Sequence, residues 1–323
     1  MKAIVHDTYG SSDVLELRDI DKPAVRDGDV LVRVHAAAVD AGVRHLMTGL
    51  PLLLRLMGYG LRAPKVPVRG REVAGRVEAV GATVTRFRPG DEVFGFCDGA
   101  FAEYVSAPED RFAAKPAGLT PEQAAAVPIS AVTALQALRD AGQVRPGQKV
   151  LVIGAAGGVG TFAVQLAKAY GAEVTGVCST TKTDLVRSIG ADDVIDYTRE
   201  DFADGARRYD LILDAAGNRS LSHLRRALTR RGTLVIVGGE GGGRWLGGTD
   251  RVLRAVMLSP FVSHRLRGLF SAERGEDLET LRELIEAGKV APVIDRTYPL
   301  SGVPEAMRHL EKNHARGKVV IVV

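Results

Sequence analysis

The spacing of hydrophobic and polar residues changes near residue 122, and this change divides the chain. Before it, short runs such as residues 14–17 and 73–80 alternate apolar with polar side chains, and Gly, Pro and Asp separate them from other short strands such as residues 30–35. Such runs are typical of strands joined by tight turns, and they predict a partly closed β-barrel. After it, apolar runs alternate with segments of helical period, which predicts a doubly wound parallel sheet and an α/β fold.

Strand–helix units are expected in regular order in the second region. Its strands are predicted at residues 149–153, 173–178, 193–195, 210–213 and 233–237. Its helices are predicted at residues 161–170, 183–188, 199–206, 221–228 and 276–287, the last one ending at Gly288. In the tail, residues 292–298 are predicted to be extended and residues 303–311 helical, and a strand at residues 318–323 is expected to return to the first domain. The chain therefore divides into one domain of residues 1–122 and 289–323 and an inserted domain of residues 123–288.

Two segments allow two interpretations each. Residues 43–60 are rich in leucine and form either a core helix or a flap over a hydrophobic site. Residues 240–248 hold many glycines and the only tryptophan of the chain, Trp245. This second segment is either a lid that closes over a flat substrate or a plain surface loop.

The apolar run at residues 149–153 leads into a turn of small residues, Gly154-Ala155-Ala156-Gly157-Gly158-Val159-Gly160. Residues with little or no side chain let the backbone approach a pyrophosphate, and the following helix offers free N–H groups to the anion. Glycines also serve ordinary turns. The repeated strand–helix units, together with this turn, indicate a dinucleotide site.

The strand at residues 173–178 carries information about the coenzyme. In domains that prefer NAD, an acidic residue about 20 positions after the glycines binds the ribose hydroxyls. Here the strand runs into Ser179-Thr180-Thr181-Lys182, without a carboxylate. Hydroxyls and a cation suit a 2′-phosphate, which favours NADPH. The same residues could form an N-cap cluster for the next helix, and both roles are compatible.

Composition excludes several classes of protein. Of 323 residues, 46% are hydrophobic, which is enough for two cores. Basic residues exceed acidic ones by 43 to 39 and are scattered, and aromatic residues make up only 5%. A nucleic-acid surface needs a basic stripe with aromatic side chains, so no nucleic-acid partner is expected.

Two cysteines, Cys97 and Cys178, stand far apart in the sequence. They exclude a disulfide scaffold and a four-cysteine zinc lobe, and they suit a reducing compartment. No uncharged apolar run approaches the roughly 18 residues that a membrane span needs, and the N-terminus has no signal-peptide pattern. We expect a cytoplasmic protein without a membrane partner.

Several short motifs resemble one family when they are taken together and in order. These are Met1-Lys2-Ala3-Ile4-Val5, Tyr9-Gly10, residues 28–34, Pro89-Gly90-Asp91-Glu92-Val93, residues 99–104, residues 124–128 with Thr133-Ala134, and Gly190-Ala191-Asp192. Over essentially its whole length, the chain resembles the zinc-independent medium-chain dehydrogenases/reductases of the quinone oxidoreductase group. The resemblance implies a partly closed, GroES-like β domain and a Rossmann domain, with the coenzyme in the cleft between them.

The resemblance also assigns binding roles. It places Ser179, Lys182 and Tyr197 around the 2′-phosphate of NADPH and Thr133 against the nicotinamide. It implies that the pyrophosphate is bound by Ala156, Gly157, Gly158 and Val159. It also implies that Gly238 and Gly239 leave space beside the nicotinamide end.

Zinc-dependent relatives carry a cysteine soon after the position of His35, and later a Gly-His-Glu. Here residues 36–40, directly after His35, include no cysteine, and the second motif reads Gly70-Arg71-Glu72. Catalytic zinc needs converging Cys, His and carboxylate ligands, so no metal is expected. Quinones and activated enones accept hydride without metal stabilisation of an alkoxide, and the protein then mainly aligns the nicotinamide with the acceptor.

One position departs from the family. An asparagine and an aspartate usually face the active site where this chain has Asp40 and Val43. Asp40 is therefore a catalytic candidate: a proton source if burial raises its pKa, or else an exposed loop acid. The same departure supports a second function, a coenzyme-binding relative that has lost catalysis and acts as an interaction protein. A zinc alcohol dehydrogenase is a third candidate, which the missing ligands disfavour.

A homodimer is expected from the edge of the parallel sheet. The last strand is predicted at residues 258–264, and open sheet edges are usually covered or paired. Relatives commonly pair this edge across a two-fold axis. Pro260 is tolerated on an edge strand but removes one donor from such a pairing.

Overall fold

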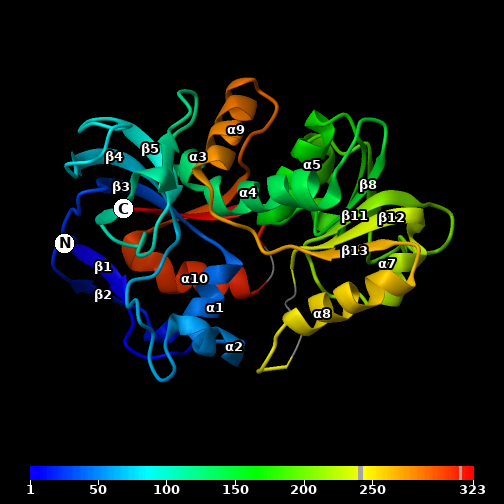
Figure 1. Cartoon of the computed structure of the whole chain (residues 1–323), viewed down its shortest axis with the longest axis horizontal. Coiled ribbons are helices and arrows are strands. Elements are labelled where there is room, and N and C mark those ends of the chain that lie inside the picture. Colours follow the sequence, from blue (N-terminus) through cyan, green and yellow to red (C-terminus); the bar gives the residue numbers. More distant parts are fainter. Residues whose placement is uncertain (239–242, 313–314) are drawn as a thin grey trace. The chain divides into compact units, whose positions relative to one another are not determined.

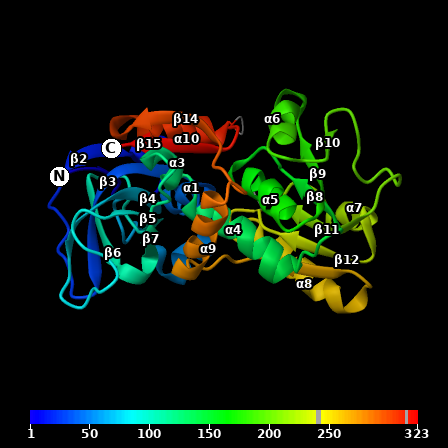
Figure 2. The same ribbon diagram turned by 90° about the horizontal axis from the view of Figure 1, so that it is seen from above.

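A computed structural model describes residues 1–238, 243–312 and 315–323 (Figures 1 and 2). The chain folds into two compact units. The first comprises residues 1–132, 273–288 and 292–323, and the second comprises residues 133–272 and 289–291.

The first unit is built on a sheet with strand order β14-β15-β3-β4-β5-β7, with β6 paired to β3. All neighbours are antiparallel except β14 and β15. Its strands are β3 (Asp29–Val39), β4 (Glu72–Val80), β5 (Glu92–Phe96), β6 (Tyr104–Pro108), β7 (Phe112–Ala114), β14 (Ile294–Pro299) and β15 (Lys318–Val322), and β1 (Lys2–Val5) and β2 (Glu16–Asp19) form a separate hairpin. The tail strand β15 pairs with β3, as the sequence predicts.

The second unit is built on a parallel sheet with order β10-β9-β8-β11-β12-β13. Its strands are β8 (Lys149–Ile153), β9 (Glu173–Cys178), β10 (Asp193–Asp196), β11 (Tyr209–Asp214), β12 (Leu228–Ile236) and β13 (Arg265–Gly268), and its helices include α5 (Gly158–Ala169), α6 (Thr183–Ser188), α7 (Leu221–Arg226) and α8 (Thr249–Leu258). In Figure 1, α5 and α8 lie on opposite faces of this sheet. The predicted α/β class, with a GroES-like β domain and a doubly wound Rossmann sheet, is confirmed.

The strand order reverses between β8 and β11. The chain proceeds from β8 to β9 and β10 on one side, and then from β11 to β12 and β13 on the other. In open α/β sheets, ligands bind at the carboxyl ends of the strands on either side of such a reversal. Ile153 ends β8 and Asp214 ends β11, so the candidate site lies around these two residues.

The predicted helix at residues 199–206 is wrong, because three aspartates fold this segment into turns. The side chains of Asp196, Asp201 and Asp204 accept hydrogen bonds from the backbone N–H groups two residues further on, at 3.0, 3.0 and 2.8 Å. Such local bonds satisfy N–H groups that a helix would otherwise use.

The predicted strand at residues 258–264 is also wrong. Helix α8 continues to Leu258, a 3₁₀ turn follows at Ser259–Phe261, and the edge strand is β13. Pro260 stands in the first turn of that 3₁₀ helix, where proline is favoured because its missing N–H would have no partner.

Along the chain, the boundaries between the two compact units fall at residues 132 and 272, whereas the sequence pattern changes near residues 122 and 288. Helix α9 (Gly275–Glu286) accounts for the second difference, because it packs against β7 of the first unit. An ion pair between Arg86 and Glu279, at 3.3 Å, also joins α9 to that unit.

Residues 43–60 were expected to be either a core helix or a flap over a hydrophobic site, and the two ends of this segment differ in burial. Val43 and Met47, on α1 (Ala41–Thr48), are fully buried in the first core. Beyond α2 (Leu52–Leu54), Leu56 and Met57 are about two-thirds exposed. Only the first part is therefore a core helix.

Both cysteines are buried and unpaired. Among the described residues, no helix has the length and apolar character that crossing a bilayer requires.

A buried ion pair joins three parts of the first unit. Lys318 on β15 donates to Glu72 on β4 and, at 3.1 Å, to the hydroxyl of Ser130 on α4 (Pro128–Gln136). The other Glu72 carboxylate oxygen accepts the N–H of Ile129 at 2.9 Å. Burial raises the pKa of the fully buried Glu72, and Lys318 opposes this shift.

We predict that Lys318→Met destabilises the protein by about 3–5 kcal/mol, because it leaves the Glu72 charge buried without its cation. The double variant Lys318→Met/Glu72→Leu should recover most of this loss. Urea unfolding of the two variants and the wild type tests the pair. A single variant that unfolds at the wild-type urea concentration would contradict the prediction.

Candidate active site

Three glycines shape the turn between β8 and α5, each in a different way. Gly154 has a φ of +82°, which opens the tight turn. Gly157 is the N-cap of α5, and a Cβ added to it would meet only the Gly154 carbonyl oxygen, at 3.4 Å. A Cβ on Gly160 would lie 2.0 Å from that same oxygen, so only glycine lets α5 pack this closely on β8. These are the three glycine roles of a dinucleotide-binding turn.

The four residues expected at the pyrophosphate, Ala156, Gly157, Gly158 and Val159, lie at the N-terminus of α5. The helix begins at Gly158, and no side chain caps it. Its first N–H groups are therefore available to an anion. Gly154 and Gly160 shape the turn from either side and are further candidate site residues. Their spacing of three residues from Gly157 is the sequence signal for them.

The residues expected at a 2′-phosphate come together at the ends of β9 and β10. Cys178 and Asp196 are register partners, so Ser179 and Tyr197 follow them side by side. The N–H of Tyr197 donates to the Cys178 carbonyl at 3.1 Å, and the N–H of Lys182 donates to the Ser179 carbonyl at 2.9 Å. Ser179 is the N-cap of a short 3₁₀ turn, but its side chain makes no capping bond.

Asp196 organises this corner and was not among the expected site residues. Its buried carboxylate accepts hydrogen bonds from the hydroxyls of Thr180 and Thr198, the latter at 2.7 Å. These hydrogen bonds, that of Thr180 first, lower the pKa of Asp196. The ionised carboxylate thereby holds the segments after β9 and β10 together.

Gly238 lies where β11 and β12 end. The N–H groups of Val237 and Gly238 donate to the Asp214 carbonyl at 3.0 and 3.2 Å. A Cβ on Gly238 would lie 2.3 Å from the Ala215 carbonyl oxygen, so no other residue fits this close approach. Gly239 lies outside the described residues, as do residues 240–242 of the segment expected to be either a lid or a surface loop. Trp245, from the same segment, is 70% exposed.

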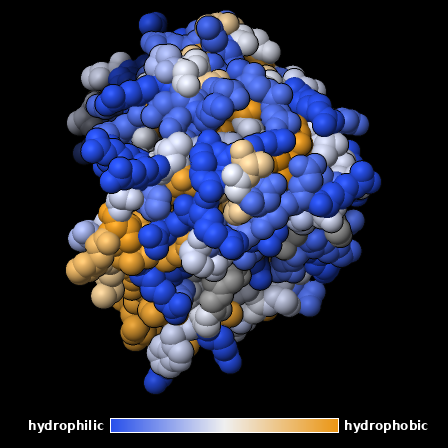
Figure 3. Space-filling model, turned by 90° about the vertical axis from the view of Figure 1, so that its right-hand side faces the viewer, coloured by the Kyte–Doolittle hydropathy of each residue, from blue (hydrophilic) through white to orange (hydrophobic). Residues whose placement is uncertain are grey.

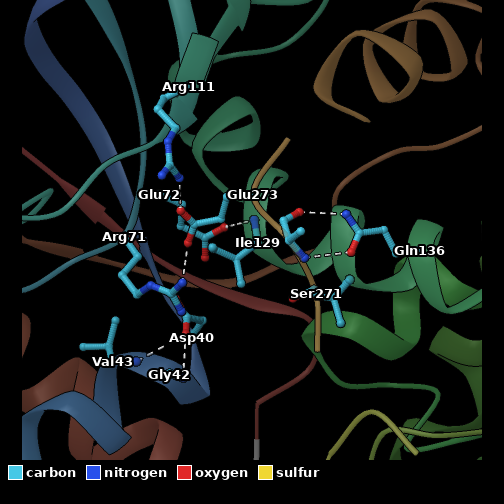
Figure 4. Close-up of polar contacts among 12 residues, drawn as sticks. Asp40, Gly42, Val43, Arg71, Glu72, Arg111, Ile129, Gln136, Ser271 and Glu273 are labelled. Carbon is cyan, nitrogen blue, oxygen red and sulfur yellow. Dashed lines mark hydrogen bonds and ion pairs between the residues drawn. The ribbon is translucent and has the colours of Figure 1, made fainter. Parts of the chain in front are cut away.

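Thr133 is 8% exposed on α4 and donates to the hydroxyl of Ser271 at 3.2 Å. One turn later, the Gln136 amide bonds to both backbone groups of Ala272, at 2.7 and 2.9 Å (Figure 4). These contacts fix α4 against residues 271–272. Nothing in the local sequence pattern points to Ser271, because it lies more than a hundred residues away.

Asp40 is the N-cap of α1. Its Oδ1 accepts the N–H groups of Gly42 and Val43 at 2.5 and 3.2 Å (Figure 4). Its Oδ2 is buried and has no hydrogen-bond partner among the residues that the structure describes. Asp40 is 9% exposed, so its interpretation as an exposed loop acid is wrong.

A network of charges surrounds the position where zinc-dependent relatives carry a histidine ligand. Arg71 and Arg111 donate to the two oxygens of the Glu273 carboxylate (Figure 4). Burial lowers the pKa of Arg71, but Asp40 and Glu273 outweigh it, so that the pKa lies above its ordinary value. A permanent cation therefore occupies this position. Across the described parts of the chain, no group of three or more His, Cys, Asp or Glu side chains is placed to hold a metal ion.

Family models match two parts of the chain. An alcohol dehydrogenase GroES-like domain matches residues 26–117, and a zinc-binding dehydrogenase domain matches residues 189–321.

Longer similarities extend over the whole chain. It is 36% identical over 354 residues to the mitochondrial NAD(P)H oxidoreductase RTN4IP1 of Bos taurus, covering 100% of this chain and 89% of that protein. It is 37% identical over 346 residues to the chloroplastic NADPH-dependent alkenal/one oxidoreductase of Arabidopsis thaliana, covering 99% and 79%. The solved quinone oxidoreductase of Coxiella burnetii has a TM-score of 0.88 at 30% identity, covering 100% of this chain and 99% of that one.

The geometry of the turn assigns different effects to substitutions at Gly157 and at Gly160, the first on dinucleotide binding and the second on stability. We predict that Gly157→Ala weakens dinucleotide binding by about tenfold or more with little loss of stability, because its methyl group stands where the backbone must approach a pyrophosphate. Gly160→Ala should instead lower the urea midpoint, because its methyl group clashes with the Gly154 carbonyl. Calorimetric titration with NADPH and urea unfolding of both variants test the assignment. Equal effects of the two variants on both measurements would contradict it.

Proposed function

Because the chain belongs to the medium-chain dehydrogenase/reductase family, whose members named above are oxidoreductases, we propose that it is an NADPH-dependent reductase of quinones or activated enones. The proposed reaction uses no metal. The proposal that the protein binds a dinucleotide coenzyme rests on the turn of Gly154, Gly157 and Gly160. Side chains at these positions would fill the cradle that the turn forms. The names of the alkenal/one and quinone oxidoreductases above support the substrate class.

Each group of candidate residues near the carboxyl ends of the parallel strands has a proposed role. Ala156, Gly157, Gly158 and Val159 bind the pyrophosphate through the N-terminus of α5. Ser179, Lys182 and Tyr197 bind the 2′-phosphate, with Asp196 positioning the segments that carry them. Thr133, fixed by Ser271, lies against the nicotinamide, and Gly238 and Gly239 leave room beside it.

When bound, NADPH supplies the hydride. Hydride addition to a quinone or an enone places negative charge on the acceptor oxygen, and a fixed cation stabilises such charge. Arg71 is our candidate for this cation. Asp40 raises the pKa of Arg71 and so offsets the burial of this cation, and this is the role that we assign to it, with water supplying the proton.

Two other functions compete with this proposal. The use of Asp40 as an N-cap favours the first, a coenzyme-binding protein with little catalysis that acts through interactions. The matches to alcohol dehydrogenase models favour the second, a medium-chain alcohol dehydrogenase.

A substrate panel distinguishes the three. The reductase should oxidise NADPH in the presence of quinones or alkenals. A protein that binds NADPH but turns over none of them fits the interaction protein. Reduction of NADP⁺ by simple alcohols, lost after chelation, fits the zinc enzyme.

We predict that Lys182→Ala weakens NADPH binding by about 1.5–3 kcal/mol, the range for a hydrogen bond to a charged group, and leaves NADH nearly unchanged. Titration of both coenzymes into wild type and variant measures this. Equal losses for the two coenzymes would show that Lys182 does not bind the phosphate.

We also propose a homodimer, formed through β13 and α8. Strand β13 is the edge of the parallel sheet, and Leu253, Val256 and Met257 of α8 are more than half exposed. The space-filling view in Figure 3 shows hydrophobic residues gathered on the surface. Light scattering at micromolar concentration should give twice the 34.4 kDa of one chain. A mass near that of one chain would contradict the dimer.

We place the protein in the cytoplasm. The two unpaired, buried cysteines support a reducing compartment. The relatives from Bos taurus and Arabidopsis thaliana carry mitochondrial and chloroplastic names, which describe those proteins.

A further inference from the structure

A second buried ion pair lies at the reversal of the parallel sheet. Asp214, the last residue of β11, is fully buried, and its carboxylate accepts a hydrogen bond from Arg251 in the first turn of α8. Its other oxygen accepts the N–H of Gly217 at 3.0 Å. The carboxylate is therefore satisfied from both sides.

The guanidinium group of Arg251 has hydrogen-bond acceptors for only some of its N–H donors. Its Nε and Nη1 are buried, and among the described residues neither has a hydrogen-bond partner. The side chain as a whole is 13% exposed, so bulk water does not replace those partners freely. Buried donors without acceptors cost free energy, and those of a guanidinium are always protonated. Such a pair of donors indicates that a ligand supplies the acceptors.

The position of the Asp214–Arg251 pair in the sheet indicates which ligand supplies these acceptors. Asp214 is in register with Ile153 of β8 and Ile236 of β12, and its carbonyl accepts the N–H of Gly238. A dinucleotide lies across the sheet at the reversal of strand order. If the pyrophosphate of a coenzyme binds at α5 and its adenosine half lies beyond β9, its nicotinamide half extends over the ends of β11 and β12.

We propose that Arg251, positioned by Asp214, binds the nicotinamide half of the coenzyme. Its Nε and Nη1 donate to oxygen acceptors of that half, the ribose hydroxyls and the carboxamide oxygen. The inference rests on the proposed coenzyme site and adds to it a residue from outside the glycine-rich turn.

The test compares a whole coenzyme with a fragment that lacks the nicotinamide half. Arg251→Lys keeps the charge beside Asp214 but removes the guanidinium donors. It should weaken NADPH binding by about tenfold or more, the effect of a hydrogen bond to a charged group. It should leave the binding of adenosine 2′,5′-bisphosphate unchanged, and both affinities are measured by titration calorimetry.

Two further variants serve as controls for the Arg251→Lys titrations. Arg254→Lys, on the same helix and 74% exposed, should change neither affinity. Asp214→Asn keeps the acceptor for Gly217 and should give a smaller, equally selective loss for NADPH. Wild-type NADPH affinity in Arg251→Lys, or equal losses for coenzyme and fragment, would overturn the inference. Failure of the wild type to bind either molecule would instead overturn the proposed function, and this inference with it.

Discussion

The pairing of Glu72 with Lys318 is the constraint on which the first unit depends. A carboxylate without water or a partner is too costly to keep ionised in a core, so β4 requires the cation that β15 brings from the far end of the chain. The same carboxylate accepts the Ile129 N–H and thereby orients the start of α4. One carboxylate thus joins the middle of the β domain, its last strand and the helix that carries Thr133.

Next to this pair, Arg71 bonds Glu273 and lies in the field of Asp40. Two adjacent residues, Arg71 and Glu72, are therefore both balanced by groups from distant parts of the chain. Where zinc-dependent relatives use this motif to hold a metal, the present chain uses it to hold charges of its own. This difference links the architecture of the β domain to the metal-free chemistry that we propose.

The elements that could be predicted from the sequence are those whose signals are local. The apolar run at residues 149–153 and the spacing of Gly154, Gly157 and Gly160 predict the strand, the turn and the helix that follows. Errors arose where side chains compete with the backbone pattern. Asp201 and Asp204 turn a helix-like segment into bends, and Pro260 begins a 3₁₀ turn where a strand was expected.

The partners of the site residues could not be predicted in this way. Glu273 lies 202 positions from Arg71, and Arg251 lies 37 positions from Asp214. No periodicity relates such pairs, because only the folded sheet brings them together. Asp40 is the exception. An aspartate directly before a helical segment is a common N-cap, and this signal could have assigned it a structural role from the sequence.

The burial of the two cysteines has a chemical consequence. Burial raises the pKa of the Cys97 thiol well above its ordinary value and that of Cys178 to about 11. Both therefore remain thiols at neutral pH, and only the thiolate is an effective nucleophile. Quinones and alkenals are soft electrophiles that alkylate thiolates. Under the function proposed above, such compounds would be present at every turnover. Two sulfurs that are protonated and out of reach would then be protected from covalent inactivation by the substrates.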